Sequence, residues 1–216
     1  AKVLKEIDQT DWEGMEANFQ KLVAQPMGLT HTVFIQNEYS IANKAEPYDK
    51  KGKWISPDRD HDSLLRYQFI APASIHSEAL DFSKWLIGLS NNQGLEAATF
   101  EEMYKAHSYV NEFNGIKVDY ALGFFKPQIP FSNIYLHGGN NYGFTSYFLL
   151  DPDKGWGFVL FTNSEYGEDL GNELSLYMLT GPDLTPFYLA AGGTMLIILL
   201  ILVMGIRFLV RRLKKA

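Results

Sequence analysis

Two apolar runs separated by a short turn segment constrain the fold of this chain more than any other feature of its sequence. Residues 144–150 and 156–162 are rich in aromatic and β-branched side chains, which is typical of β-strands. Between them, Pro152 presets one φ angle and Gly155 can adopt a positive φ, so residues 151–155 predict a turn. We therefore expect a β-hairpin around which the rest of the chain is organised.

The segment that leads into this hairpin is polar and rich in glycine. It consists of His137, Gly138, Gly139, Asn140, Asn141, Tyr142 and Gly143. We expect a loop here, because asparagine and glycine dominate turns. Glycine also lets a backbone approach a ligand and expose its N–H groups, and N–H groups beside a polar side chain are a common way to build an oxyanion hole. The residues alone leave both readings open: a functional loop, or a wide hairpin loop that only satisfies turn geometry.

Length and composition set further bounds. The 216 residues suffice for one domain with appendages. The absence of cysteine excludes disulfides and thiolate metal sites. Asp58, Asp60 and Asp62 alternate as in a calcium-binding loop, but Ser63 and Phe69 stand where such a loop needs Gly and Glu. We therefore expect no metal site and no cofactor.

The charges are unevenly distributed. No acidic residue follows Asp183, whereas the C-terminus carries five basic residues: Arg207, Arg211, Arg212, Lys214 and Lys215. The part of the chain before this basic tail has a formal charge of about −11. Such a body has no electrostatic reason to bind nucleic acid, so nucleic acid is excluded as a partner.

Four segments have helical patterns: residues 11–24, 78–90, 99–104 and 168–179. Capping patterns predict that Thr10, Ser77 and Thr99 begin the first three, and Pro26 should end the first. Residues 37–70 are polar and irregular.

Residues 184–206 contain no charged side chain and are dominated by Leu, Ile, Met and Val. About 20 such residues span a bilayer core, so we expect a transmembrane helix at residues 187–207. A buried core helix would be shorter and interrupted by polar residues. By the positive-inside rule, the basic tail at 208–216 lies in the cytoplasm. The body, residues 1–180, would then lie outside a cell membrane that the chain crosses once, joined to the span by a linker at 181–186.

The glycine-rich segment and the hairpin together resemble a known motif. His137-Gly138-Gly139, then Gly143-Phe144, and a hairpin that closes on Thr162-Asn163 are similar to the third motif of the serine β-lactamase and penicillin-binding-protein-like hydrolases, in their class C and esterase-like branch. That motif is Lys or His, any residue, then Gly, on a strand that faces the nucleophile. Residues 25–32, 71–77 and 119–124 resemble further segments of the same family, in the family's order.

This resemblance implies an α+β fold, an antiparallel sheet with packed helices, to which the predicted transmembrane helix is added. It places the His137 side chain at the site, where it would hydrogen-bond the substrate or assist proton transfer. It makes the backbone N–H of Asn140 an oxyanion donor and lets the substrate lie close to Gly138 and Gly139. Asn141 and Tyr142 would line the same substrate site.

The family's nucleophile motif, Ser-x-x-Lys, does not occur in this sequence. Tyr109-Val110-Asn111 has the letters of the second motif, Tyr-x-Asn, but stands in the wrong place in the order. We therefore expect a C-terminal portion of such a hydrolase, whose partners are an acyl substrate (a β-lactam, a peptidoglycan peptide or an ester), the bilayer and the missing N-terminal portion. The alternative is a non-catalytic, membrane-tethered binding or sensor module on the same fold.

Overall fold

The computed structural model describes residues 11–56, 75–113, 115–130, 132–141, 143–180 and 185–213, and the side chains of 185–191 and 208–213 are not part of the description. The chain divides into two compact units, Ala1–Gly171 and Asn172–Ala216. The helices are α2 (Trp12–Phe19), the π-helix η1 (Gln20–Ala24), α3 (Gln25–Met27), α4 (Glu38–Asn43), α7 (Ala79–Ser90), α8 (Ala97–Tyr104), α9 (Gly167–Thr180) and α10 (Thr185–Leu213). The strands are β1 (Ser108–Phe113), β2 (Ile116–Tyr120), β3 (Phe125–Ile129), β4 (Ser132–Asn133), β5 (Tyr135–Asn141), β6 (Phe144–Asp151) and β7 (Trp156–Thr162).

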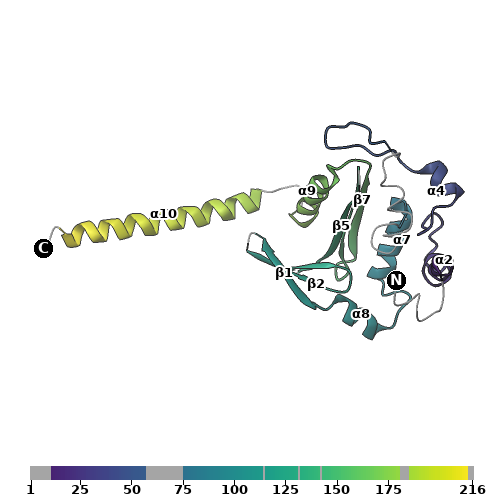
Figure 1. Cartoon of the computed structure of the whole chain (residues 1–216). Coiled ribbons are helices and arrows are strands. Elements are labelled where there is room, and N and C mark those ends of the chain that lie inside the picture. The colour runs from purple at the N-terminus through teal and green to yellow at the C-terminus, as the bar shows by residue number, and fades with distance from the viewer. Residues whose placement is uncertain are drawn as a thin grey trace. The chain divides into compact units, whose positions relative to one another are not determined.

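An antiparallel sheet forms the centre of the first unit (Figure 1). Its strand order is β1-β2-β3-β5-β6-β7, and β4 pairs with β3. The predicted hairpin is confirmed: β6 and β7 pair from Thr145↔Thr162 to Asp151↔Trp156. Gly155 adopts the expected positive φ, +67°. The α+β class predicted from the resemblance is therefore correct for this unit.

The prediction of a loop at residues 137–143 is wrong. Residues His137 to Asn141 continue strand β5 and pair in unbroken register with β6, ending at Asn141↔Phe144. Glycine and asparagine are poor strand formers, but the ladder to β6 supplies backbone hydrogen bonds all along the segment. The partner strand therefore overrides the local preference.

Helix α7 covers one face of the sheet (Figure 1) and forms the larger core with it. Leu86 and Leu89 of α7 pack with Phe124 and Phe148 of the sheet region, and Phe100 of α8 joins them. Burying each such side chain is worth about 1.5–3 kcal/mol.

Tyr104, at the end of α8, packs against this core, and its ring lies 4.4 Å from that of Tyr135. Its hydroxyl donates to the carbonyl of Leu89 over 3.3 Å. Burial, together with the nearby Tyr135, raises the pKa of Tyr104 to about 12.

The opposite face of the sheet carries a second core, built from the alternate residues of the same strands. Ile134, Tyr147 and Leu149 are buried there. Alternation along a strand sends successive side chains to opposite faces, which explains why Phe148 and Leu149 belong to different cores. The first residues of α9 pack on this face, because a Cβ atom at Gly171 would come within 2.7 Å of the Tyr147 ring.

The N-terminal helix begins and ends differently from the prediction. Asp11 caps α2 by accepting the N–H of Gly14 over 2.9 Å, whereas Thr10 lies outside the described residues. The helix does not stop before Pro26 but continues through η1 and α3 to Met27, where Gly28 ends it at φ +68°. Pro26 lies in the first turn of α3, directly after the π-helical turn η1, where the regular α-helical hydrogen-bond pattern is interrupted.

The expected caps of the next two helices are also wrong. Glu78 and Glu96 occupy the N-cap positions of α7 and α8, and neither makes a side-chain capping bond. The Ser77 hydroxyl instead lies 2.8 Å from that of Thr32. Residues 37–56, expected to be irregular, contain α4, which Asn37 begins with a capping box. Residues 57–74, with Asp58, Asp60, Asp62 and the 71–74 part of a matched segment, lie outside the description.

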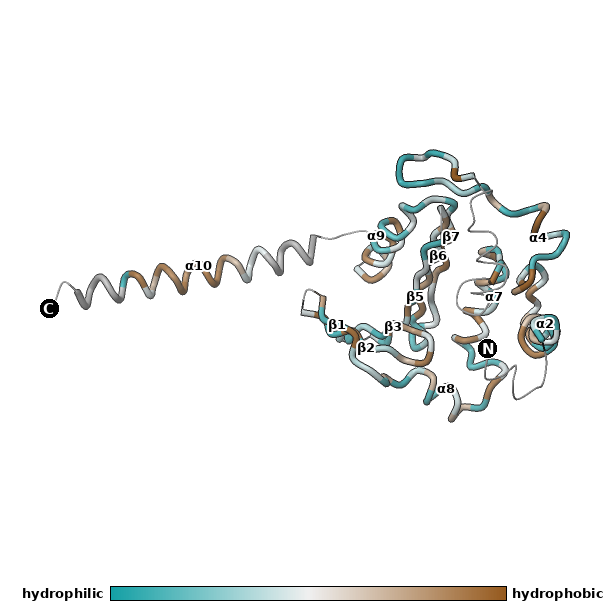
Figure 2. Tube along the Cα trace, viewed as in Figure 1, coloured by the Kyte–Doolittle hydropathy of each residue, from teal (hydrophilic) through white to brown (hydrophobic). Residues whose placement is uncertain are grey.

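The predicted helix at 168–179 is confirmed as α9. Residues 185–213 form one further helix, α10, whose described side chains are largely apolar and exposed (Figure 2). Among the residues whose side chains are described, no helix combines the length and hydrophobicity that crossing a bilayer requires. The transmembrane helix expected at 187–207 stays a prediction.

Candidate functional site

Strand β5 has one edge that no described strand covers beyond Leu136. On one side it pairs with β6 along its whole length. On the other side it meets β3 at a single pair, Phe125↔Leu136, because β3 begins at Phe125 and runs away from the site. The described part of the chain therefore leaves His137 to Asn141 open along one edge.

The register shows which backbone groups face this open edge. Two residues separate Asn141 from Phe144, and the pair that closes such a two-residue hairpin is hydrogen-bonded. Bonded and non-bonded pairs alternate along an antiparallel ladder. The N–H groups of Gly138 and Asn140 therefore point away from β6, toward the open edge. The N–H of Leu136 points in the same direction, which agrees with the pairing of Leu136 to Phe125 on β3.

The His137 imidazole lies where the β3–β5 pairing ends, half-buried among aromatic side chains. Its Nε2 atom is 3.2 Å from the hydroxyl of Tyr120 on β2. Its ring stacks on that of Phe125, with centroids 5.3 Å apart and planes 29° apart. Hydrogen bonding and stacking together restrict the orientation of the ring.

The Asn140 side chain is fixed by two neighbours. Its amide donates to the Glu168 carboxylate over 2.9 Å, and its carbonyl oxygen lies 2.8 Å from the buried Thr145 hydroxyl. That hydroxyl is equally close to the Ser164 carbonyl oxygen, so one proton serves two acceptors. The Asn140 side chain is thus tied within the protein, which leaves its backbone N–H as the group that faces the edge.

The tip of the β5–β6 hairpin rests against residues from far earlier in the chain. Gly143, at φ +83°, accepts the N–H of Tyr48 over 3.4 Å. A Cβ atom at Gly143 would lie 2.7 Å from Tyr48 N and 2.8 Å from Pro47 Cβ and from Ile55 Cδ1. Glycine is therefore required here by conformation and by space.

Gly138 and Gly139 are under weaker constraint. Both have ordinary extended backbones, since neither is among the positive-φ residues. A Cβ atom at Gly139 would come within 3.1 Å of the Ser146 hydroxyl, and one at Gly138 within 3.4 Å of the Tyr147 ring. Packing therefore does not require glycine at either position.

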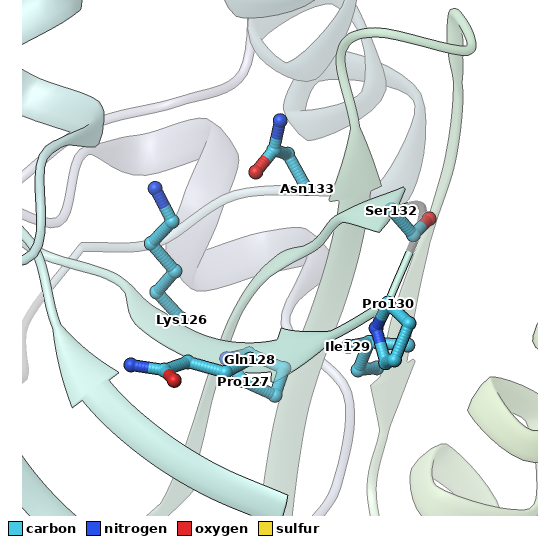
Figure 3. A pocket seen from close by; sticks show the side chains of 7 residues that line it. All are labelled: Lys126, Pro127, Gln128, Ile129, Pro130, Ser132 and Asn133. Carbon is cyan, nitrogen blue, oxygen red and sulfur yellow. The ribbon is translucent and has the colours of Figure 1, made fainter.

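A polar cavity of about 480 Å³ adjoins the end of β5, lined by Lys50, Asn140, Asn141, Glu165 and Glu168. Another, of about 400 Å³, lies at the β3–β4 turn between Lys126 and Asn133 (Figure 3). The second cavity holds no predicted site residue. Its polar side chains are engaged elsewhere, as when Asn133 donates to Asp153 over 2.6 Å.

A cluster around Asp81 lies apart from the β5 edge. Asp81 is fully buried and accepts from the His31 N–H at 2.6 Å, the Thr32 hydroxyl at 3.1 Å and the Lys84 ammonium at 2.8 Å. Burial acts to raise the pKa of Asp81, but these donors outweigh it and hold the pKa below its usual value. His31 Nδ1 also lies 2.9 Å from Glu78. Ligand atoms of His31, Glu78 and Asp81 lie within 4.8 Å of one another. The Asp81 carboxylate, however, already accepts three hydrogen bonds, two of which join His31 and Thr32 to α7.

The structure thus brings four of the predicted site residues, His137, Gly138, Gly139 and Asn140, to one open strand edge. Asn141 lines the polar cavity at the end of that edge, and Tyr142 lies outside the described residues. Tyr109 and Asn111, the out-of-order Tyr-x-Asn letters, lie on the exposed strand β1.

The sequence analysis did not assign Tyr120 and Phe125 to the site. Tyr120 does belong to the segment 119–124, which resembles a segment of the family. Strand β2 ends at Tyr120 and is followed by a turn with Gly123 at φ +91°. The pairing Tyr120↔Phe125 across this turn brings both rings to His137.

Solved structures of similar fold agree with this architecture. The octameric penicillin-binding protein homologue from Pyrococcus abyssi aligns with a TM-score of 0.67 and 20% identity, over 83% of this chain and 40% of that one. The beta-lactamase/D-alanine carboxypeptidase from Pseudomonas syringae gives a TM-score of 0.60 and 12% identity, over 78% and 53%. A class C beta-lactamase gives 0.57 and 16%, over 78% and 51%. The chain thus spans about half the length of these proteins or less, and at these identities the likeness is one of fold.

Comparison with curated protein sequences finds no match. A family model described as Beta-lactamase, however, matches residues 2–180, which include the whole sheet and the open edge of β5. The chain belongs to the beta-lactamase family.

Proposed function

We propose that this chain forms one wall of the active site of a serine acyl hydrolase. In this proposal the nucleophile motif, Ser-x-x-Lys, comes from a separate N-terminal portion of the same fold. The substrate is a β-lactam, a peptidoglycan peptide or an ester, and its acyl group lies along β5. His137 hydrogen-bonds the substrate or assists proton transfer, and the backbone N–H of Asn140 stabilises the developing oxyanion.

The observation that carries this proposal is the open edge of β5 from His137 to Asn141. An extended substrate can add to such an edge through main-chain hydrogen bonds. The register turns the N–H groups of Gly138 and Asn140 toward that edge, so two donors are offered along it. A donor held in place before reaction stabilises developing charge without reorganisation.

The proteins of similar fold support the choice of chemistry. They include a beta-lactamase/D-alanine carboxypeptidase and a class C beta-lactamase. Both reactions transfer an acyl group to a nucleophile, and a serine nucleophile needs an adjacent base. No serine of the present sequence is followed three residues later by lysine, so the covalent step is assigned to the other portion.

Labelling with a fluorescent fluorophosphonate or penicillin tests this proposal. The 216-residue chain incubated alone should stay unlabelled. Together with an N-terminal portion that carries Ser-x-x-Lys and Tyr-x-Asn, in one polypeptide or as two, the complex should be labelled on the serine of that portion. His137→Ala should slow labelling, by about 10²–10⁴-fold for an acid–base role and by about 2- to 10-fold for a single neutral hydrogen bond to the substrate.

His107→Ala is the matched control. His107 lies outside β5 and hydrogen-bonds the Glu102 carbonyl oxygen over 3.0 Å, so its loss should leave labelling unchanged. Stoichiometric labelling of the chain alone would contradict the proposal, as would labelling of the complex that ignores His137. Substrate binding without any labelling would favour a non-catalytic binding or sensor module.

We further propose that residues 187–207 anchor the protein in the cell membrane, with the body outside and the tail, 208–216, in the cytoplasm. The support is the uncharged sequence from 184 to 206 and the basic residues that follow it. Protease added to intact cells should remove the body and spare an epitope on the tail. Protection of the body would refute this orientation.

A further inference from the structure

The imidazole of His137 has one engaged and one unengaged nitrogen. Nε2 lies 3.2 Å from the Tyr120 hydroxyl. Among the described residues, Nδ1 has no hydrogen-bond partner. Whatever His137 does for a ligand at the β5 edge must therefore involve Nδ1, unless the bond to Tyr120 breaks.

The chemistry of the two groups decides which one donates. A phenol O–H is a stronger proton donor than the N–H of a neutral imidazole, and the bare imidazole nitrogen is a stronger acceptor than a phenol oxygen. The better pairing is therefore a Tyr120 O–H that donates to an unprotonated Nε2. The proton of the neutral ring then resides on Nδ1, because one ring nitrogen is a donor when the other is an acceptor.

Neighbouring strands hold Tyr120 in place for this role. Tyr120 pairs with Phe125 across β2 and β3, and their rings meet edge to face at 5.0 Å. The Phe125 ring in turn stacks on that of His137 at 5.3 Å. Each of the three rings thus contacts the other two, with Tyr120 and His137 6.2 Å apart between centroids.

From this geometry we propose that Tyr120 is a positioning residue, which holds neutral His137 as the Nδ1–H tautomer and so presents an N–H donor, not a base, to the substrate. The proposal rests on the proposed function only in naming the substrate as the recipient of that hydrogen bond. It deepens that function by assigning His137 one of the two roles left open: binding the substrate's oxygen atoms, with proton transfer left to other groups.

The tautomer can be measured without any activity. In the full 216-residue chain, labelled with ¹⁵N-histidine, two-bond ¹H–¹⁵N correlations distinguish protonated from bare ring nitrogens. The chain has 5 histidines, and the signal of His137 is the one lost in His137→Gln. At a pH where the ring is neutral, Nδ1 should be protonated and Nε2 bare.

Tyr120→Phe removes the hydroxyl and keeps the ring, so the contacts to Phe125 survive. The His137 signals should then move toward the Nε2–H tautomer or a mixture of the two. Tyr109→Phe, on exposed strand β1, is the matched control and should change nothing. A wild-type spectrum with protonated Nε2, or one that Tyr120→Phe leaves unchanged, would overturn the proposal.

Labelling rates separate this inference from the proposed function. In the complex with the N-terminal portion, Tyr120→Phe should slow labelling by about 2- to 10-fold, the typical worth of one neutral hydrogen bond. Labelling that depends on His137 but not on Tyr120 would overturn the positioning role alone. The expected tautomer combined with labelling that ignores His137 would instead contradict the proposed function and leave the Tyr120–His137 interaction established.

Discussion

Gly143→Ala should destabilise the protein through two effects that can be measured separately. At φ +83°, an L-residue is in the left-handed region, which costs roughly 1–2 kcal/mol relative to glycine. The added methyl group would also lie 2.7 Å from Tyr48 N, too close for any real contact. Because Tyr48 N is a backbone atom, its segment must move, and overpacking of this kind typically costs about 1–3 kcal/mol. Together we expect a loss of roughly 2–5 kcal/mol in the free energy of unfolding.

Gly115→Ala is the control that isolates the first effect. Gly115 has nearly the same φ, +80°, but a Cβ atom there meets nothing within 4 Å. Its substitution should therefore cost only roughly 1–2 kcal/mol. Urea unfolding of the full chain, followed by tryptophan fluorescence, gives the midpoints and slopes for both variants and wild type.

The difference between the two variants is the decisive quantity. We expect Gly143→Ala to be less stable than Gly115→Ala by about 1–3 kcal/mol. Equal losses of unfolding free energy in the two variants would show that residues 47–55 do not pack tightly against Gly143. The reasoning about the packing at the end of the β5–β6 hairpin would then be refuted.

Three further substitutions test other contacts. Asp81→Ala should lower the free energy of unfolding by about 3–5 kcal/mol at pH 7, because it leaves the Lys84 ammonium and the His31 N–H without their buried partner. The folded-state pKa of Asp81 is lowered, so its contribution to stability is complete above the unfolded pKa of about 3.9 and is lost as the pH falls through the folded-state pKa. The difference in unfolding free energy between variant and wild type should therefore shrink in acid. A difference that does not change with pH would contradict this. The unfolded chain releases the Tyr104 hydroxyl proton near pH 10, whereas the folded protein holds it to about pH 12, so wild type should lose stability as the pH rises above 10. Tyr104→Phe should remove this loss. Identical alkaline melting curves for the two proteins would refute the burial argument. Thr145→Val should cost about 1–2 kcal/mol and broaden the Asn140 amide signals in NMR spectra, because the hydroxyl that joins Asn140 to Ser164 is lost; sharp, unshifted signals would contradict this.

The elements that the sequence predicted well are those whose pattern is local and uninterrupted. Strands β6 and β7 are uninterrupted runs rich in aromatic and β-branched residues, and the turn between them contains Pro152 and Gly155, so no distant contact is needed to recognise them. The helix at 168–179 was equally visible from its periodicity. The resemblance assigned His137 and Asn140 to the site, and the structure places both on the open edge of strand β5, whereas composition alone suggested a loop.

What the sequence did not reveal depends on contacts between distant residues. Ser77 has the properties of a helix cap, but its hydroxyl meets Thr32, 45 residues earlier. The backbone N–H of His31 donates to Asp81, 50 residues later, and nothing in the sequence around His31 indicates that partner. The ring contacts of Tyr120 and His137 arise only when β2, β3 and β5 are assembled. No spacing rule in a single sequence indicates such pairs.

The contacts of residues 46–48 with Gly143 and with Asn163 also affect the order in which the site is assembled. The Glu46 carbonyl oxygen accepts the Asn163 amide, although 117 residues separate the two in the chain. At a synthesis rate of roughly 5–20 residues per second, Glu46 is synthesised roughly 6–23 seconds before Asn163. Contacts of such long sequence range also slow folding itself, because the chain between them must be ordered first. The outer end of the candidate site therefore forms late, and in a nascent chain Tyr48 and its neighbours remain available to chaperones or proteases until β7 is complete.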